Sequence, residues 1–251
     1  MNAQVPLTPI PLNAGEINNK LHDSYWRVSV IDETTSTQVT LRSSNPDHGD
    51  VLLAEYQSQG RGRLERKFLA EKFSAILMSL FIVPQQEKNA WSFLPVVAGL
   101  SVADLLSPIL PVEVKWPNDV NAEGKKIAGL LCESTENGVI VGIGLNIDML
   151  HPPVDGATSL FIETGKQHER NQMVVNLLRI FSTNVQLWEE GVDLRDKYRK
   201  YSSTLGRKVI ATKLDGSQIT GAATDIDLTG ALLLDNGERI SVGDVEHLRG
   251  K

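Results

Sequence analysis

The chain has 251 residues, a net charge of -6 and a sequence pI near 5.4, which suits one large domain or one domain with a small addition. The acidic balance argues against a protein that coats nucleic acid, and the single cysteine, Cys132, excludes a framework of disulfides. No structural metal is expected, because the histidines do not share metal-ligand spacing with that cysteine. They are His22, His48, His151, His168 and His247.

The first 13 residues contain three prolines and lack the basic and apolar regions of a secretion signal. We expect residues 1–13 to form a poorly ordered arm and residues 14–22 to form a short helix, which leaves no room for a helix-turn-helix domain. No uninterrupted apolar stretch reaches the ~20 residues that a membrane span needs. The pattern therefore favours a cytoplasmic protein that binds no membrane.

A hydroxyl-rich run, residues 34–38, follows a predicted strand at 26–31 and precedes a predicted helix. Ser and Thr at such a place most often cap the helix by accepting hydrogen bonds from its free N–H groups. The alternative is that Ser36, Thr37 and Gln38 point into a pocket and bind a small polar group. The local pattern alone favours the cap.

The most informative stretch is the Gly-Arg segment, residues 60–68, which comes soon after an apolar strand at 51–54. Gly60 and Gly62 let the backbone approach a ligand closely. The positive side chains are Arg61, Arg63, Arg66 and Lys67. On an acidic chain this predicts a local site for anionic oxygens, although a solvated turn or an RNA-binding tail can have a similar composition.

The middle of the chain alternates apolar strands with a helix and predicts an α/β domain. Strands are expected at 74–83 and 112–116, a helix at 91–109, and a strand hairpin at 125–133 and 139–147. Lys115 stands at the end of a strand, where it is either a solvent-facing edge residue or a fixed charge for a carboxylate or phosphate. The hairpin glycines, Gly129, Gly142 and Gly144, are unfavourable inside strands unless a ligand or another backbone comes close.

Neither a dinucleotide fingerprint nor a Walker A sequence is present, so any ATP binds by another scheme. A helix with one apolar face is expected over 174–188 and a second near 194–201. Short strands at 208–213, 219–227, 231–234 and 238–242, separated by Gly-containing turns, then predict a small β-barrel.

Four pieces together resemble the catalytic domain of biotin protein ligases: the Ser36-Thr37-Gln38 run, YQSQGRGRLERKF, KWPNDV followed by KIAGLL, and GIGLNID. GRGR and KWPND in one chain form a specific combination. The resemblance implies an α/β fold like that of class II aminoacyl-tRNA synthetases, with a mixed sheet flanked by helices, over residues 1–202. It also implies an SH3-like C-terminal domain over 203–251 and no N-terminal DNA-binding domain.

The implied reaction joins biotin to ATP as biotinyl-5'-AMP and then transfers biotin to a lysine of a biotin carboxyl carrier protein or domain. The implied cofactors are ATP and Mg²⁺, with Mg²⁺ held largely by phosphate oxygens and water, so that no dedicated metal cluster is needed. The chain is expected to act as a monomer or weak homodimer and to bind no nucleic acid. We expect the Gly-Arg segment to order over the reactive intermediate as a lid.

The resemblance also implies roles for individual residues. The catalytic residues would be Lys115, Arg61 and Arg63. The biotin site would comprise Ser36, Thr37, Gln38, Gln57, Gly60, Arg61, Gly62, Arg63, Lys115 and Gly129. The ATP and phosphate site would comprise Arg63, Arg66, Phe68, Asn118, Lys126 and Asn146.

The chain departs from the family pattern at three places. Gln38 replaces a usual Asn, Phe68 replaces a usual Trp, and Glu65 stands where Gly is frequent. Two other functions remain open at this point. One is a lipoate or octanoate ligase or transferase of the same fold, and the other is an RNA-binding module that uses the Gly-Arg segment.

Overall fold

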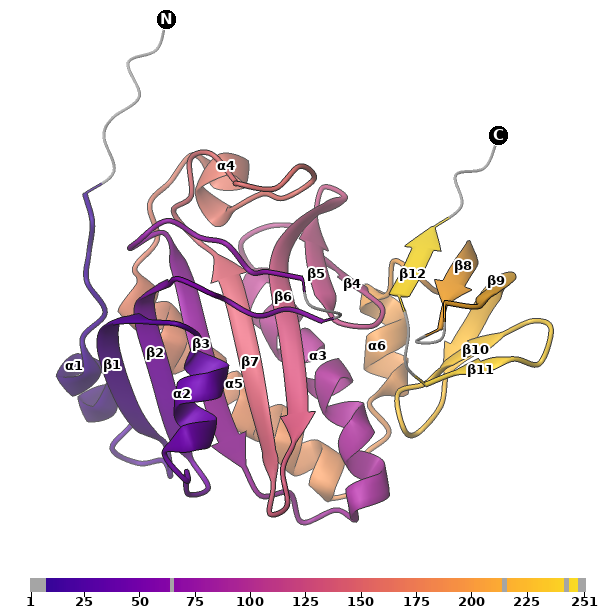
Figure 1. Ribbon diagram of the computed structural model, residues 1–251, viewed down its shortest axis with the longest axis horizontal. Helices are drawn as coiled ribbons and strands as arrows, with labels where there is room; N and C mark the ends of the chain where they lie inside the picture. The colour runs from indigo at the N-terminus through magenta and orange to yellow at the C-terminus, as the bar shows by residue number, and fades with distance from the viewer. Residues whose placement is uncertain (1–7, 64–65, 214–215, 242–243, 248–251) are drawn as a thin grey trace, which may run out of the picture.

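The computed structural model describes residues 8–63, 66–213, 216–241 and 244–247, and its centre is a seven-stranded mixed sheet (Figure 1). The strand order is β1-β2-β3-β7-β6-β5-β4, with β1 parallel to β2 and all other neighbours antiparallel. The strands are β1 (Arg27–Thr34), β2 (Asp50–Gln57), β3 (Ala75–Ile82), β4 (Glu113–Lys115), β5 (Asp119–Ala122), β6 (Lys125–Ser134) and β7 (Val139–Asn146). This confirms the mixed α/β sheet.

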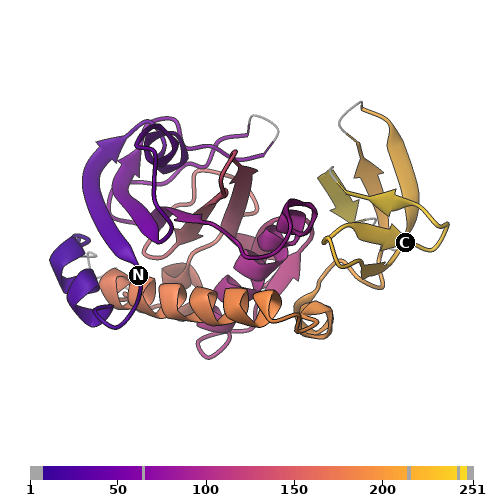
Figure 2. The same ribbon diagram turned by 90° about the horizontal axis from the view of Figure 1, so that it is seen from below.

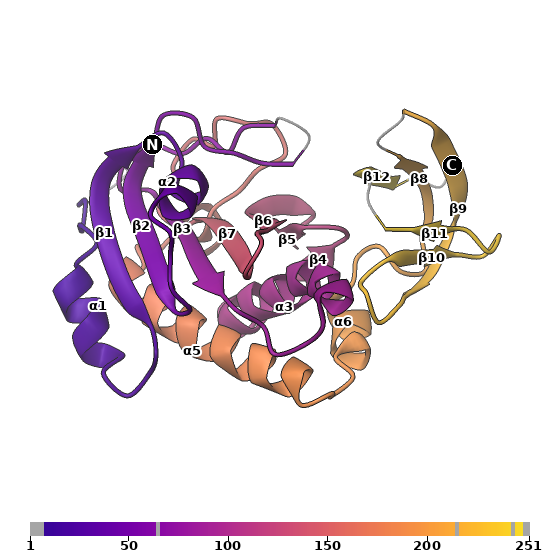
Figure 3. The same cartoon turned by 60° about the horizontal axis from the view of Figure 1, so that its bottom comes forward.

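Helices cover the two faces of the sheet unequally, as Figures 2 and 3 show. Helices α3 (Leu94–Leu106) and α5 (Arg170–Glu189) pack against each other and cover one face, whereas the short α2 (Thr37–Ser43) lies on the other. The remaining helices are α1 (Ala14–Lys20), η1 (Lys88–Phe93), α4 (Leu160–Thr164) and α6 (Arg195–Tyr201). The face that carries α2 is therefore the more open one.

Helix α3 is apolar on almost every side because it is sandwiched between the sheet and α5. It continues the 3₁₀ turn η1, so the helix expected over 91–109 begins earlier and ends at Leu106. The joined stretch, Lys88–Leu106, has the length and hydropathy of a membrane span, but 72% of it is buried inside the protein. Its apolar character is that of a core helix.

The segment before α1 is anchored by a buried ion pair, so the expectation of a poorly ordered arm is wrong for residues 8–13. Arg170 Nη1 lies 2.8 Å from Glu55 Oε2, and these side chains are 1% and 4% exposed. Arg170 also donates to the carbonyl of Ile10, and Glu55 accepts from the N–H of Leu12, itself 6% exposed. Arg170 and Glu55 therefore use backbone groups of residues 8–13 as further hydrogen-bond partners. Residues 1–7 lie outside the described part of the chain.

The C-terminal residues form a five-stranded antiparallel sheet in the order β11-β10-β9-β8-β12. Its strands are β8 (Lys208–Thr212), β9 (Gln218–Ile226), β10 (Leu232–Leu234), β11 (Arg239–Ile240) and β12 (Asp244–His247). The sequence reading missed β12, because charged residues and a histidine surround its single apolar residue, Val245. Trp116 ties the two sheets together by donating from Nε1 to the carbonyl of Gly230 at 2.9 Å.

We predict that Arg170→Ala lowers the free energy of unfolding by about 3–5 kcal/mol, because it leaves the Glu55 carboxylate buried without its cation. Lys72→Ala is the matched control, since Lys72 pairs with Asp32 where the two side chains are 40% and 71% exposed. That change should cost no more than about 1 kcal/mol. Urea denaturation of both variants measures the difference, and equal losses would contradict this account of the N-terminal anchor.

Candidate active site

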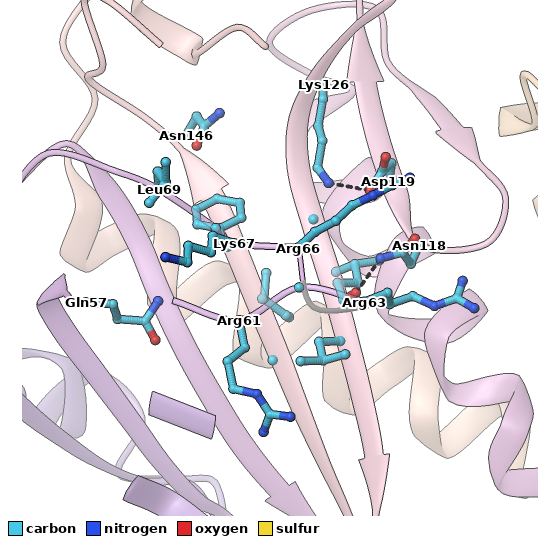
Figure 4. A pocket seen from close by; sticks show the side chains of 18 of the residues that line it. Gln57, Arg61, Arg63, Arg66, Lys67, Leu69, Asn118, Asp119, Lys126 and Asn146 are labelled. Carbon is cyan, nitrogen blue, oxygen red and sulfur yellow. Dashed lines mark hydrogen bonds and ion pairs between the residues drawn. The ribbon is translucent and has the colours of Figure 1, made fainter. Parts of the chain in front are cut away.

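A cavity of about 400 Å³ opens on the face of the sheet that carries α2. Its walls come from the start of α2, from β2, β3, β6 and β7, and from two loops, the Gly-Arg segment and residues 153–157. Figure 4 shows Gln57 and Lys126 on opposite sides of the Gly-Arg segment. Stretches that lie far apart in the sequence thus meet in one pocket.

The Gly-Arg segment crosses the cavity as a narrow hairpin. The N–H of Phe68 donates to the carbonyl of Gly60 at 2.9 Å, and the N–H of Gly62 donates to that of Arg66 at 2.7 Å. A Cβ on Gly60 would lie 2.2 Å from the Phe68 carbonyl oxygen, so this position requires glycine. Leu64 and the departure Glu65 lie outside the described residues. Whether the hairpin orders only on ligand binding stays a prediction.

The cations of the Gly-Arg segment do not all point the same way. Arg61, Arg63, Arg66 and Lys67 all line the cavity. The guanidinium of Arg61, however, lies 3.4 Å from the carboxylate of Glu133, which also binds Arg42 at 3.0 Å. Arg61 is therefore partly neutralised at the rim of the cavity.

The floor of the cavity is built from the glycines of β6 and β7. Gly129 faces Gly144 across the two strands. A Cβ on Gly144 would lie 2.5 Å from the ring of Phe68, and one on Gly142 would lie 2.7 Å from Gln38 Oε1. The predicted close approach is thus real, but here side chains make it, in place of a ligand or a backbone. Phe68 and Gln38 can lie flat on the strands only because these positions lack a Cβ.

Lys126 is the cation that the sheet itself supplies to the cavity. Its Nζ lies 2.6 Å from Asp119 Oδ1, although the pair is poorly aligned for a hydrogen bond. A Cβ on Gly129 would lie 2.9 Å from the same Nζ, so the ammonium rests on the glycine floor. Its backbone pairs with the loop 153–157 through the Gly156 carbonyl at 2.8 Å. Lys126 is therefore held from three sides.

Two asparagines stand at the ends of strands on either side of β6: Asn118 comes just before β5, and Asn146 ends β7. Asn118 Nδ2 donates to the carbonyl of Leu130 at 2.7 Å, and Asn146 Nδ2 donates to that of Thr158 at 2.9 Å. The Oδ1 of Asn146 is buried and has no hydrogen-bond partner among the described residues. An orphaned buried oxygen is costly, so it marks a place where a ligand or a hydrated cation completes the site.

Lys115 does not line the cavity, and its assignment to the pocket is corrected. It ends β4, the edge strand, and its charge acts on the C-terminal sheet. Burial lowers the pKa of His247, and the ammonium of Lys115 and the guanidinium of Arg207 lower that pKa further. Strand alternation alone does not reveal this, because the buried Val114 turns Lys115 to the same face of the sheet as its partner Asp119, which lines the cavity. Lys115 lies outside the cavity because β4 is the edge strand, one strand beyond Asp119. Gly60 is likewise absent from the cavity lining, since it lies where the hairpin begins.

The hydroxyl-rich run lines the pocket instead of capping its helix. Ser36 occupies the N-cap position of α2 but makes no capping hydrogen bond with its side chain. Thr37 and Gln38 are each 3% exposed and bond to Gln57 and Ser79. The remaining predicted residues of the pocket, Gly62, Phe68 and Gly129, line it as expected.

Sequence reasoning missed Ser79, Asp119 and the loop 153–157, all of which line the cavity. Ser79 could have been found, because it is the one hydroxyl inside the otherwise apolar strand β3. Cys132 follows the cavity residue Leu131 on β6, and burial raises the pKa of its thiol to about 12, although the guanidinium of Arg63 lowers it. The described residues contain no group of three or more His, Cys, Asp or Glu side chains that could hold a metal.

Comparisons with known proteins agree with this geometry. Residues 28–149 match the model of the biotin/lipoate A/B protein ligase family, and residues 204–248 match the biotin protein ligase C-terminal domain. The chain is 37% identical to a biotin--[acetyl-CoA-carboxylase] ligase of Mycobacterium tuberculosis, over 95% of this chain and 97% of that protein. It is 30% identical to the bifunctional ligase/repressor BirA of Escherichia coli, over 89% of this chain and 73% of that protein.

Among solved structures, the chain is similar to the biotin protein ligase of Aquifex aeolicus in complex with biotin and ATP. The TM-score is 0.79 and the identity 31%, over 89% of this chain and 99% of that chain. The same enzyme without ligand gives a TM-score of 0.74 at 28% identity, over 89% of this chain and 99% of that chain.

We predict that Gly144→Ala destabilises the protein by about 1–3 kcal/mol, because the added methyl group collides with the half-buried ring of Phe68 and the strands cannot move apart. In a Phe68→Ala background the same methyl group meets no ring, so its cost should largely disappear. Urea denaturation of the two single variants and the double variant gives the coupling energy. Additive losses would show that the ring does not rest on Gly144.

Proposed function

This chain belongs to the biotin protein ligases, and we propose that the cavity binds biotin and ATP together, joins them and passes the biotinyl group to an acceptor lysine. First, a carboxylate oxygen of biotin attacks the α-phosphorus of ATP, and pyrophosphate leaves as biotinyl-5'-AMP forms. Then the amine of the acceptor lysine attacks the acyl carbon, AMP leaves, and the amine loses a proton as the amide forms. The acceptor is a biotin carboxyl carrier protein or domain.

The observation that carries this proposal is the division of the cavity lining into two kinds of group. The Gly-Arg segment and β6 contribute the cations Arg61, Arg63, Arg66, Lys67 and Lys126. Helix α2 with its N-cap and strands β2 and β3 contribute no charge to the lining. Besides Met78, their groups are the neutral hydrogen-bonding side chains Ser36, Thr37, Gln38, Gln57 and Ser79. The cavity suits a ligand with one neutral polar head and one anionic end beside a phosphate. Biotin, with its ureido ring and carboxylate, is such a ligand.

Lys126 takes the catalytic role that the sequence reading gave to Lys115. Two anions, the biotin carboxylate and the α-phosphate, must approach each other before the bond forms. A preorganised ammonium at their meeting point stabilises the charge that develops in the transition state. The ion pair with Asp119 and the support of Gly129 hold Lys126 in advance, so little reorganisation is needed. Arg63 and Arg66 add positive charge from the hairpin side of the same cavity.

We assign Phe68, Asn118 and Asn146, which line the cavity, to the binding of ATP. The ring of Phe68 offers a flat apolar surface for the base, without the N–H donor that a tryptophan would bring. Asp119 and the orphaned Oδ1 of Asn146 are hard oxygen donors that fit Mg²⁺ carried by the ATP phosphates. Bound Mg²⁺ would withdraw charge from the phosphate oxygens and ease the departure of pyrophosphate.

We further propose the following limits to the activity. The catalytic unit ends near residue 202, where Ser202 pairs with Val114 of β4. The C-terminal sheet forms a second unit over residues 203–251. The protein works in the cytoplasm, where ATP is supplied, as a monomer or weak homodimer. Its net charge of -6 disfavours nucleic-acid binding.

The proposed function is tested by exchange of labelled pyrophosphate into ATP. The expected result is exchange that depends on biotin and not on lipoate or octanoate, since the reverse of the first step needs biotinyl-5'-AMP. Exchange driven by lipoate or octanoate would instead assign the chain to the other branch of its family. Transfer of labelled biotin to a purified carrier domain then tests the second step.

We predict that Lys126→Ala slows biotin-dependent exchange by about 100-fold or more, the effect expected when one preorganised charge is removed from a closed site. Lys115→Ala is the matched control, because it removes the same charge from the edge strand outside the cavity. Its exchange rate should stay close to that of the wild type. The opposite order of effects would restore Lys115 as the catalytic lysine.

A further inference from the structure

Four polar side chains form a continuous buried hydrogen-bond chain behind the proposed biotin site. Ser79 is 0% exposed, Thr37 and Gln38 are each 3% exposed, and Gln57 is 9% exposed. Thr37 Oγ1 lies 2.8 Å from Ser79 Oγ, which lies 3.0 Å from Gln38 Oε1. At the other end, the backbone N–H of Thr37 donates to Gln57 Oε1 at 2.7 Å.

The amide of Gln38 has only one orientation that satisfies its surroundings. Its Nε2 donates to the carbonyl of Ile140 at 3.1 Å and to that of Leu131 at 3.3 Å. Carbonyl oxygens only accept, so both N–H bonds of the amide are committed to the strands β6 and β7. The Oε1 atom must therefore face Ser79.

This orientation sets the direction of every proton along the chain. Because Gln38 Oε1 can only accept, the single hydroxyl proton of Ser79 goes to it. The Thr37 hydroxyl has two acceptors in reach, Ser79 Oγ at 2.8 Å and Gln57 Oε1 at 3.1 Å. Gln57 Oε1 already accepts from the backbone N–H of Thr37, and Ser79 has no proton left, so only donation from Thr37 to Ser79 satisfies all three side chains. The hydroxyl of Thr37 thus keeps a lone pair for the cavity, which both residues line.

Gln57 is fixed from the same end. Its Oε1 accepts from the N–H of Thr37, so its NH₂ group points the other way, towards Gly60, where a Cβ would lie 3.1 Å from Nε2. Within the described part of the chain this NH₂ makes no hydrogen bond to another residue. The cavity therefore presents an acceptor from Thr37 and a donor from Gln57, the complement of a group that has N–H and C=O side by side.

We propose that Gln38 is a positioning residue that makes Thr37 an acceptor towards the biotin ureido ring, without contacting biotin itself. The inference rests on the proposed function and revises the expectation that Gln38 binds biotin directly. It also gives a physical reason for the glutamine that replaces the asparagine usual in the family. The longer amide reaches Ser79 and both strand carbonyls because Gly142 has no Cβ, which would lie 2.7 Å from Gln38 Oε1.

The first test is the affinity of Gln38→Leu for biotin, measured by calorimetry without ATP. Without Gln38 Oε1, the hydroxyl of Ser79 can turn and donate to Thr37, which uses the lone pair meant for the ligand. The dissociation constant for biotin should rise about five- to tenfold, the effect of one lost hydrogen bond. The dissociation constant for ATP and kcat at saturating biotin should not change. Val39→Ala, at an exposed neighbour on α2, is the matched control.

The second test adds a methyl group at position 142 and shortens the side chain at position 38. Gly142→Ala should weaken biotin binding, because its methyl group displaces the amide of Gln38. Combined with Gln38→Asn, which withdraws the amide by one methylene, the same methyl group should cost much less, so the two effects should be strongly non-additive. Additive effects would contradict the proposal, as would unchanged biotin affinity in Gln38→Leu, or an equal loss of biotin and ATP affinity.

The wild-type protein separates this proposal from the function on which it rests. If it neither binds biotin nor supports biotin-dependent exchange, the proposed function fails. If it does both and Gln38→Leu binds biotin as tightly as the wild type, only the role of Gln38 fails. Thermal unfolding of each variant verifies that the protein compared is folded.

Discussion

The absence of Cβ atoms along two paired strands is the constraint on which the active site depends. Gly129, Gly142 and Gly144 leave β6 and β7 bare on the open face of the sheet. Three side chains rest on the bare backbone within the distance that any Cβ would occupy: Lys126 from the start of β6, Gln38 from α2 and Phe68 from the Gly-Arg segment. The pairing of β6 with β7 makes the floor of the pocket rigid, and the missing side chains make the pocket deep. A pocket is thereby cut into a sheet whose hydrogen bonds remain intact.

The distribution of charge follows from the same arrangement. The chain as a whole is acidic, with a net charge of -6, yet the cavity gathers five cations. Some of this charge is balanced locally, since Asp119 contacts Lys126 and Glu133 contacts Arg61. These carboxylates keep cations from repelling one another before substrates arrive. Anionic substrates can then replace them, which makes binding depend on the phosphate and carboxylate oxygens that the reaction needs.

Much of the fold and most of the site could be predicted from the sequence, because strong local patterns agree with the tertiary structure. The apolar runs that became β3 and β7 and the helix α5 are examples. The errors arose at residues whose place in the site depends on the position of their strand in the sheet or on a partner far away in the sequence. Lys115 and Lys126 both belong to recognisable motifs, and only the order of strands in the sheet, with β4 at the edge and β6 inside, separates the edge lysine from the pocket lysine. Likewise, the partner of Ser36-Thr37-Gln38 is Ser79, some 40 residues away.

The N-terminal anchor has a consequence for how the chain is made. The carbonyl of Ile10 accepts a hydrogen bond from Arg170, 160 residues later in the sequence, and the N–H of Leu12 accompanies it to Glu55. A ribosome releases the chain from its N-terminus, so the buried cation that holds residues 8–13 is among the later parts of the catalytic unit to emerge. The segment synthesised first must therefore stay undocked throughout most of translation. Residues 8–13 can dock onto the sheet only after α5 has been synthesised and folded. Their docking therefore indicates that the catalytic unit is nearly complete.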